Sequence, residues 1–175
     1  MLKLVSEVLG SKVVEFDGNT TIGEIINWVV DPNTRRVVSF VIKQGGLLSA
    51  PSALTTIDIV EYGPGIVVVR NQASVVPPHE VAGLPKLLKA GHRIIGGSAQ
   101  TQSGRILGTV ENVLFETTDS TIQKIYVKPR IIDMVRYPDL VIPADQIVSI
   151  EPRRTIFTDE AGRPTSQTSA QPSVG

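Results

Sequence analysis

The sequence has no cysteine and, among 175 residues, only two histidines, two methionines and one tryptophan. Without cysteine there is no disulfide framework, no thiolate metal site and no cysteine nucleophile. His79 and His92 alone cannot supply a three-histidine metal site. An excess of one charge is lacking too, because 17 basic side chains balance 17 acidic ones. This balance argues against a protein that coats DNA and against an acidic disordered chain.

Long hydrophobic runs are also missing. No uncharged apolar stretch approaches the roughly 18 residues that a membrane span needs. The first ten residues carry Lys3 and Glu7 and contain no long apolar segment, so we expect no signal peptide. The length suits one medium domain or two small ones. We therefore expect a soluble, cytoplasmic protein.

The apolar residues that are present favour β-structure. Valine and isoleucine number 23 and 18, against 12 leucines and 9 alanines. Branching at Cβ stiffens a side chain in a way that suits a pleated sheet better than a helix. Fifteen glycines and twelve prolines interrupt the chain at short intervals. This composition predicts an all-β protein of short strands joined by turns.

The sequence contains an internal repeat. Residues 23–31 align with residues 108–116 at an offset of 85, and the return segment 37–43 aligns with 122–128. Residues 54–62 align with 142–150 at an offset of 88. Identity is low, but turns and apolar positions keep their order over about 50 residues, which favours duplication over chance.

Each copy is expected to hold five or six strands. In the first copy we expect them at Val13–Phe16, Gly23–Val30, Val37–Ile42, Ile57–Val60 and Ile66–Val69. In the second copy we expect an apolar entry at Ile94–Ile95, then strands at Gly108–Phe115, Ile122–Val127, Ile147–Ile150 and Thr155–Phe157. So few short strands cannot form a two-sheet sandwich of ordinary size, whereas a small barrel buries the inner face and removes free edges.

The expected organisation has four parts. A first barrel covers residues 1–76, and a linker covers residues 77–91, with a short helix ended by Gly91. A second barrel covers residues 92–158, each barrel closing around its own apolar interior. Residues 159–175 are rich in Ser, Thr, Gln, Pro and Gly, which predicts a flexible tail.

The segment 17–43 carries a family pattern, DG-x(3)-IG-E-I-x(2)-W-VVD-P-x-T-x-R-VV-x-F-VI-K. It resembles the PRC-barrel domain. The second copy matches the early part more loosely but carries the closing element of the family as Val141-Ile142-Pro143 followed by Ile147. The first copy has Thr55 where that proline would stand. The resemblance covers about 130 residues and implies two PRC-type barrels in tandem.

The resemblance also carries functional implications. The domain is shared by the cytoplasmic part of the photosynthetic reaction-centre H subunit and by the C-terminal half of a ribosome maturation factor. Family members typically act as docking or assembly modules, without a known set of catalytic residues. This implies a non-enzymatic adaptor that binds a protein partner, in a photosynthetic or electron-transfer complex attached to a membrane. The alternative is an RNA-metabolism or ribosome-maturation factor.

No motif in the sequence indicates catalysis. The segment Gly104–Gly108 lacks the third glycine and the lysine of a phosphate-binding loop, so its glycines are expected in turns. No serine lies in a nucleophile elbow, and neither histidine stands in a triad order. The spacing of His79, Glu80 and His92 does not require a metal. We expect no enzyme activity, no metal and no cofactor.

Seven residues are candidates for binding a partner. Trp28 lies in an unbroken apolar run, which predicts packing against the second barrel, the linker helix or another subunit. The other candidates lie in the late loops of the second copy: Arg130, Met134, Arg136, Tyr137, Arg153 and Arg154. The arginines can contact RNA phosphate or an acidic protein face, and too few aromatic residues accompany them for nucleic acid to be the leading hypothesis. Self-association stays open.

Overall fold

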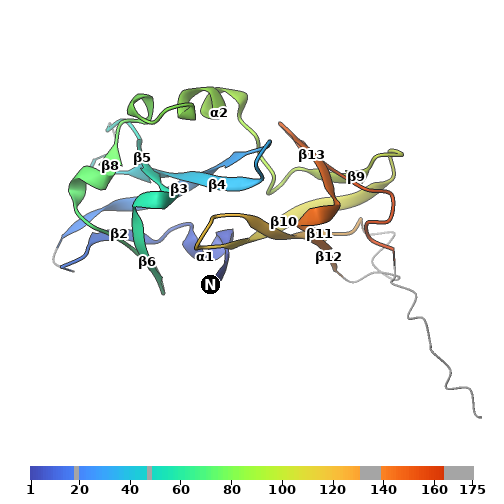
Figure 1. Cartoon of the computed structure of the whole chain (residues 1–175), viewed down its shortest axis with the longest axis horizontal. Helices are drawn as coiled ribbons and strands as arrows, with labels where there is room; N and C mark the ends of the chain where they lie inside the picture. Colours follow the sequence, from blue (N-terminus) through green and yellow to red (C-terminus); the bar gives the residue numbers. More distant parts are fainter. Residues whose placement is uncertain (18–19, 47–48, 131–138, 164–175) are drawn as a thin grey trace, which may run out of the picture.

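A computed structural model of the chain describes residues 1–17, 20–46, 49–130 and 139–163. The protein is all-β and consists of two barrel-like sheets that lie next to each other along its long axis (Figure 1). Within the described ranges, each sheet has seven strands. The prediction of two β-barrels in tandem is confirmed.

The first sheet has the strand order β6-β7-β2-β3-β4-β5-β8. Its strands are β2 (Lys12–Glu15), β3 (Thr21–Asp31), β4 (Arg36–Lys43), β5 (Ser52–Thr55), β6 (Ile59–Gly63), β7 (Ile66–Val69) and β8 (Val75–Val76). Neighbouring strands run antiparallel, except that β2 and β7 are parallel. A 3₁₀-helix, η1 (Thr56–Asp58), joins β5 to β6.

The second sheet repeats this order as β13-β14-β9-β10-β11-β12, and strand β1 (Leu2–Leu4) pairs with β10. Its other strands are β9 (Ser98–Thr101), β10 (Ile106–Glu116), β11 (Ile122–Lys128), β12 (Leu140–Pro143), β13 (Ile147–Glu151) and β14 (Arg154–Phe157). The pair β9 and β14 is parallel, as β2 and β7 are in the first sheet. A 3₁₀-helix, η4 (Ala144–Gln146), occupies the place of η1.

The two sheets share irregularities as well as order. Strand β3 has register shifts between Ile25 and Asn27 and between Val29 and Val30. Strand β10 has shifts between Val110 and Asn112 and between Leu114 and Phe115, each 85 residues further on. Bulges at equivalent positions bend both long strands in the same way, which supports an origin by duplication.

Two strand boundaries differ from the sequence-based expectation. Ile94 and Ile95 are not in a strand, and the entry strand of the second sheet is β9, four residues later. The sequence of β9, SAQT, has no β-branched apolar residue, but Ala99 and Thr101 are buried because β10 and β14 pair with its two edges. In the first half, the expected strand at Ile57 begins at Ile59, because η1 covers the preceding residues.

The two interiors are continuous, although each barrel was expected to close around its own. One hydrophobic cluster contains buried residues of both halves. At its centre the ring of Phe115 lies 6.4 Å from that of Phe40 and 6.0 Å from that of Tyr62. These edge-on and tilted ring contacts join a strand of the second sheet to two elements of the first. The halves therefore pack as one body.

Short helices complete the chain. Helix α1 (Val5–Val8) follows β1, and helix α2 (Leu84–Ala90) lies in the linker, as expected, with Gly91 at its end in the left-handed conformation (φ 62°). Two 3₁₀-helices, η2 (Gln72–Ser74) and η3 (Pro78–Glu80), precede it. Among the described residues, no helix has the length and apolar character needed to cross a bilayer.

Packed structure continues past residue 158, where the tail was expected to begin. Ala161 is fully buried, and its carbonyl accepts a hydrogen bond of 2.8 Å from the Arg105 side chain. The Asp159 carboxylate accepts a hydrogen bond from the Ser103 amide. These contacts hold residues 159–163 against the second sheet. Residues 164–175 lie outside the described part of the chain.

Candidate protein-docking groove

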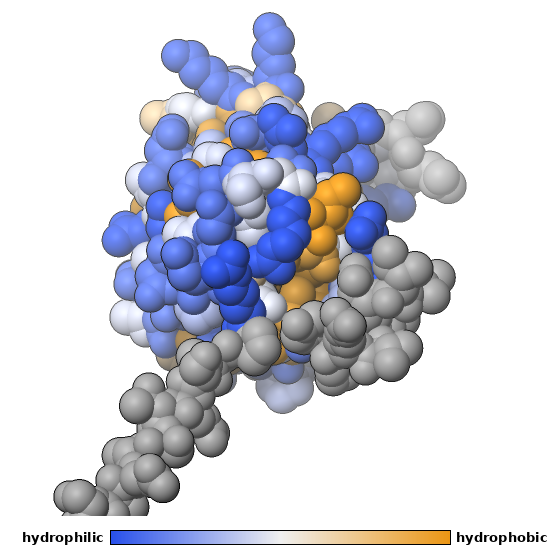
Figure 2. Space-filling view, turned by 90° about the vertical axis from the view of Figure 1, so that its right-hand side faces the viewer, coloured by the Kyte–Doolittle hydropathy of each residue, from blue (hydrophilic) through white to orange (hydrophobic). Residues whose placement is uncertain are grey.

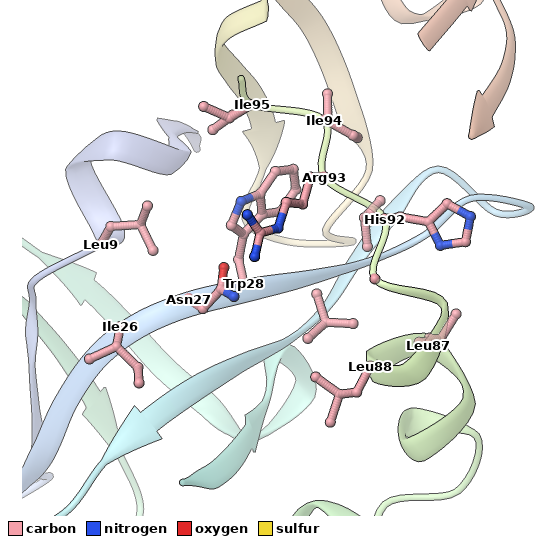
Figure 3. A pocket seen from close by; sticks show the side chains of 13 residues that line it. Leu9, Ile26, Asn27, Trp28, Leu87, Leu88, His92, Arg93, Ile94 and Ile95 are labelled. Carbon is pink, nitrogen blue, oxygen red and sulfur yellow. The ribbon is translucent and has the colours of Figure 1, made fainter. Parts of the chain in front are cut away.

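A groove of about 480 Å³ lies between β3 of the first sheet, helix α2 and the segment 91–95 that leads to the second sheet (Figure 3). We call it the β3–α2 groove. Its lining residues are Leu9, Ile26, Asn27, Trp28, Val29, Val30, Leu87, Leu88, Gly91, His92, Arg93, Ile94 and Ile95. Among the described residues, most side chains that line it are apolar and His92 and Arg93 are the titratable ones, while its exposed lining surface is mixed polar and apolar.

A bulge in β3 places Trp28 in the groove. The Asn27 side-chain oxygen accepts a hydrogen bond of 2.9 Å from the Trp28 amide, and in β10 Asn112 accepts the same bond from Val113. In each strand the bond satisfies a backbone amide that follows directly after a bulge. Trp28 is half-buried and packs against the shared core with part of its ring surface, while it lines the groove with the rest.

Helix α2 forms the second wall. Leu84 is 2% exposed and packs with Val29 and Ala53 in a small cluster on the outer face of the first sheet. Pro85 stands in the first turn, where a proline ring fits without loss of a hydrogen bond. Leu88, on the groove side of the helix, is 38% exposed, and Ile26 on the strand is 48% exposed. Two large aliphatic side chains are thus left open to solvent on facing walls.

The segment 91–95 forms the third wall and is tied to the second sheet. The Arg93 amide donates a hydrogen bond of 2.9 Å to the Pro152 carbonyl, and Ile94 is buried in the shared core. Gly97 permits this close approach, because a Cβ there would stand 2.7 Å from the Arg93 carbonyl oxygen. With the backbone held in this way, the Arg93 side chain lies over the groove beside Trp28 (Figure 3).

Exposed apolar side chains also occur away from the groove. Ile57 is 91% exposed and lines a smaller hollow of about 300 Å³ near η1. Seen from the end of the molecule formed by the second sheet, the surface is mostly hydrophilic, with one band of apolar side chains (Figure 2). The β3–α2 groove therefore combines a hollow of about 480 Å³ with the only tryptophan of the sequence.

The predicted partner-binding residues do not all gather at this site. Trp28 lines the groove, whereas Arg153 and Arg154 line a separate hollow of about 440 Å³ at the turn between β13 and β14. Arg154 pairs with Glu151, and Arg130 is exposed after the end of β11. Met134, Arg136 and Tyr137 lie outside the described residues.

Sequence reasoning missed Ile26, Leu88 and Arg93 as members of the groove. Two sequence features could have pointed to them: Ile26 lies in the apolar run beside Trp28, and Leu88 lies in the short apolar helix of the linker. What brings them together is the path of the linker over the outer face of β3, which no local pattern encodes.

Shifted pKa values occur at structural positions outside the groove. A hydrogen bond from Lys12 lowers the pKa of the Glu24 carboxyl, and hydrogen bonds from Thr121 lower that of Asp119. Burial raises the pKa of the Tyr62 hydroxyl, which contacts no hydrogen-bond partner in the described structure. Within the described ranges, no three metal-binding side chains come together.

Comparison with known proteins identifies one family. The model of the PRC-barrel domain matches residues 2–76. A search of curated proteins finds no match to the chain. The second sheet repeats the strand order of the matched region, which is consistent with two PRC-type domains in tandem.

Proposed function

Because the PRC-barrel domain model matches residues 2–76 and a second sheet repeats the strand order of the first, we propose that the protein is a non-enzymatic adaptor. PRC-barrel domains generally mediate protein–protein interactions and are generally not catalytic. The adaptor docks onto a larger assembly, and the β3–α2 groove is its docking site for a protein partner.

The observation that carries this proposal is that the half-buried Trp28 lines a hollow together with two exposed aliphatic side chains, Ile26 and Leu88. Binding energy at protein interfaces concentrates on tryptophan and arginine side chains in pockets that become desolvated on binding. Trp28 and Arg93 are side chains of this kind, and they line one wall each. A rigid scaffold on both sides keeps the ordering cost of binding low.

The resemblance to the reaction-centre H subunit domain suggests the kind of assembly. We place the partner in a photosynthetic or electron-transfer complex, with the adaptor associated peripherally at a membrane and acting on the cytoplasmic side. Apolar side chains and the Arg93 guanidinium both line the groove, which suits a segment that carries apolar side chains and a carboxylate.

The alternative, an RNA-metabolism or ribosome-maturation factor, has less support. It depends on the arginines of the second half, and Arg154 is paired with Glu151. An arginine already paired with a carboxylate contributes less to binding a phosphate backbone.

Affinity capture with cross-linking tests the proposal. The wild-type chain is compared with Ile26→Glu/Leu88→Glu, and Ile57→Glu is the matched control because Ile57 is exposed and lies outside the groove. We expect capture to identify a partner protein. Once purified, that partner should bind the wild type and the Ile57→Glu control with equal affinity, and the double variant at least tenfold more weakly. Recovery of no stable partner, together with a monomer in sedimentation velocity, would contradict an adaptor role.

Co-sedimentation with ribosomal subunits at moderate salt separates the two functions. The adaptor proposal predicts that the chain stays in the supernatant. Salt-sensitive co-sedimentation that Arg153→Ala abolishes would favour the RNA alternative instead.

A further inference from the structure

Strand β1 shows how an extended segment can sit on one of the long strands. Leu2, Lys3 and Leu4 pair antiparallel with Glu116, Phe115 and Leu114 of β10. The same residues of β10 also pair with β11, so β1 occupies the opposite edge, beyond the point where β9 ends. Helix α1 follows directly, and its Ser6 exchanges hydrogen bonds with Asn112.

The equivalent edge of β3 carries no such strand among the described residues. Val29, Val30 and Asp31 pair with β4 on one side. On the other side β2 pairs with β3 only as far as Glu24, and Gly10 and Ser11 bond the backbone of Ile25. Beyond that point β3 borders the β3–α2 groove, which Val29 and Val30 line. The groove therefore lies where β1 lies on the other half.

The repeat explains why this place is open. At the offset of 86 that relates β2 to β9, residues 2–4 correspond to residues 88–90. Residues 88–90 are the last turn of α2, so they cannot pair with β3 as β1 pairs with β10. Lys89 and Ala90 are the equivalents of Lys3 and Leu4, and they lie in a helix where the latter lie in a strand.

We propose that the β3–α2 groove binds an extended segment of a partner protein, which adds to β3 at Val29–Asp31 as a further strand. This inference rests on the proposed function and specifies how the partner is held. Strand addition uses backbone hydrogen bonds for affinity and side-chain pockets for specificity. Leu87 and Leu88 line the groove on its α2 side and Trp28 on its β3 side, so the segment carries apolar side chains at alternating positions.

Charge adds a second requirement on the segment. His92 and Arg93 are the titratable residues of the groove, and none of the acidic side chains that the structure describes lines it. A carboxylate on the segment is therefore attracted by the Arg93 guanidinium, whereas a lysine at the same position is not. Because Arg93 is exposed, salt screens this attraction.

The test uses peptides and the single tryptophan. The first peptide has the sequence of residues 1–8, which contains the strand seated on β10, and the second carries Lys3→Glu to provide the carboxylate. Trp28 fluorescence of the full-length protein reports binding, because Trp28 is the only tryptophan and lines the groove. Hydrogen–deuterium exchange of residues 26–31 reports whether a strand has been added.

We expect both peptides to shift Trp28 emission and to slow exchange at residues 26–31 at least tenfold, with tighter binding of the Lys3→Glu peptide at low salt. Leu88→Glu weakens binding at least tenfold, and Ile57→Glu leaves it unchanged. Peptides N-methylated at residues 2, 3 and 4 lose binding, because they cannot donate the backbone hydrogen bonds.

Two results would overturn the inference. One is no change in Trp28 emission with either peptide at millimolar concentration, and the other is binding without slower exchange at residues 26–31. Neither result removes the adaptor function, because capture of a partner by the wild type and its loss in the groove variant are measured independently of these peptides. If both sets of experiments fail, the adaptor function fails as well.

Discussion

Arg35 and Ser120 adopt the same left-handed backbone conformation, with φ of 56° and 62°, at the turns of two hairpins 85 residues apart. The Ser120 carbonyl accepts a hydrogen bond of 2.9 Å from the Val37 amide, and the Arg35 carbonyl accepts one of 2.9 Å from Ile122. Each bond is the repeat-equivalent of the other. The hairpin turns of the two halves therefore join in a two-fold manner, like the matched faces of a symmetric dimer.

Replacement of Ser120 tests this conformation. A β-branched residue with positive φ is strained, so Ser120→Val is expected to lower the free energy of unfolding by about 2 kcal/mol. Ser120→Gly relieves strain but adds backbone freedom to the unfolded chain. It should therefore change the free energy of unfolding by less than about 1 kcal/mol. Urea unfolding measures both. Gln123→Val, at an exposed position of β11, is the control, and an equal loss there would contradict the explanation.

Gly108 permits the close approach of β10 and β11. A Cβ there would stand 2.0 Å from the Lys128 carbonyl oxygen, and φ is +150°. Gly108→Ala is expected to destabilise the protein by about 3 kcal/mol or more, through strain and overpacking together. Gly45→Ala has positive φ but open space around it, so it should cost only about 1 kcal/mol. Thermal unfolding compares the stability of the two variants. Similar losses of stability would exclude a steric contribution at Gly108.

Tyr62 buries a hydroxyl with no hydrogen-bond partner in the described structure. Tyr62→Phe keeps the ring contacts with Phe40 and Phe115 and removes this cost, so it should stabilise the protein by about 1 kcal/mol. Burial raises the pKa of Tyr62 in the folded state, so the wild type should lose stability as the pH rises above about 10. The variant should lack this part of the alkaline decline. Urea unfolding at neutral and alkaline pH checks both effects.

Leu84 holds helix α2 against the first sheet. Leu84→Ala removes a buried side chain that contacts the cluster of Val29 and Ala53, and should destabilise α2 locally by about 2 to 4 kcal/mol. Amide exchange in residues 84–90 should accelerate, and Trp28 emission should move to longer wavelength as the groove wall loosens. Leu88→Ala, at a position 38% exposed, should have a much smaller effect on exchange. If the two variants behave alike, α2 is not anchored by Leu84.

Particular residues show why some of the fold was predictable. The strands β3, β4, β10 and β11 are rich in valine and isoleucine and end at turns with Pro, Asn, Asp or Gly, so local preference and final structure agree. Strand β9 was missed because its residues Ser98–Thr101 carry no such preference, and its two neighbours impose the extended conformation. The groove was missed, apart from Trp28, because its walls come from three separate segments.

The sequence by itself determined the all-β class, the two repeats, the short linker helix and the positions of most turns. Each of these depends on residues close together in the chain, where side-chain shape and backbone freedom act directly. Only the tertiary structure decided that the two barrels share one core, that Leu2–Leu4 pairs with β10, and that the matching edge of β3 faces an open groove. Those features join segments as far apart as Leu2 and Glu116, and depend on which complementary surfaces meet once the chain has closed long loops.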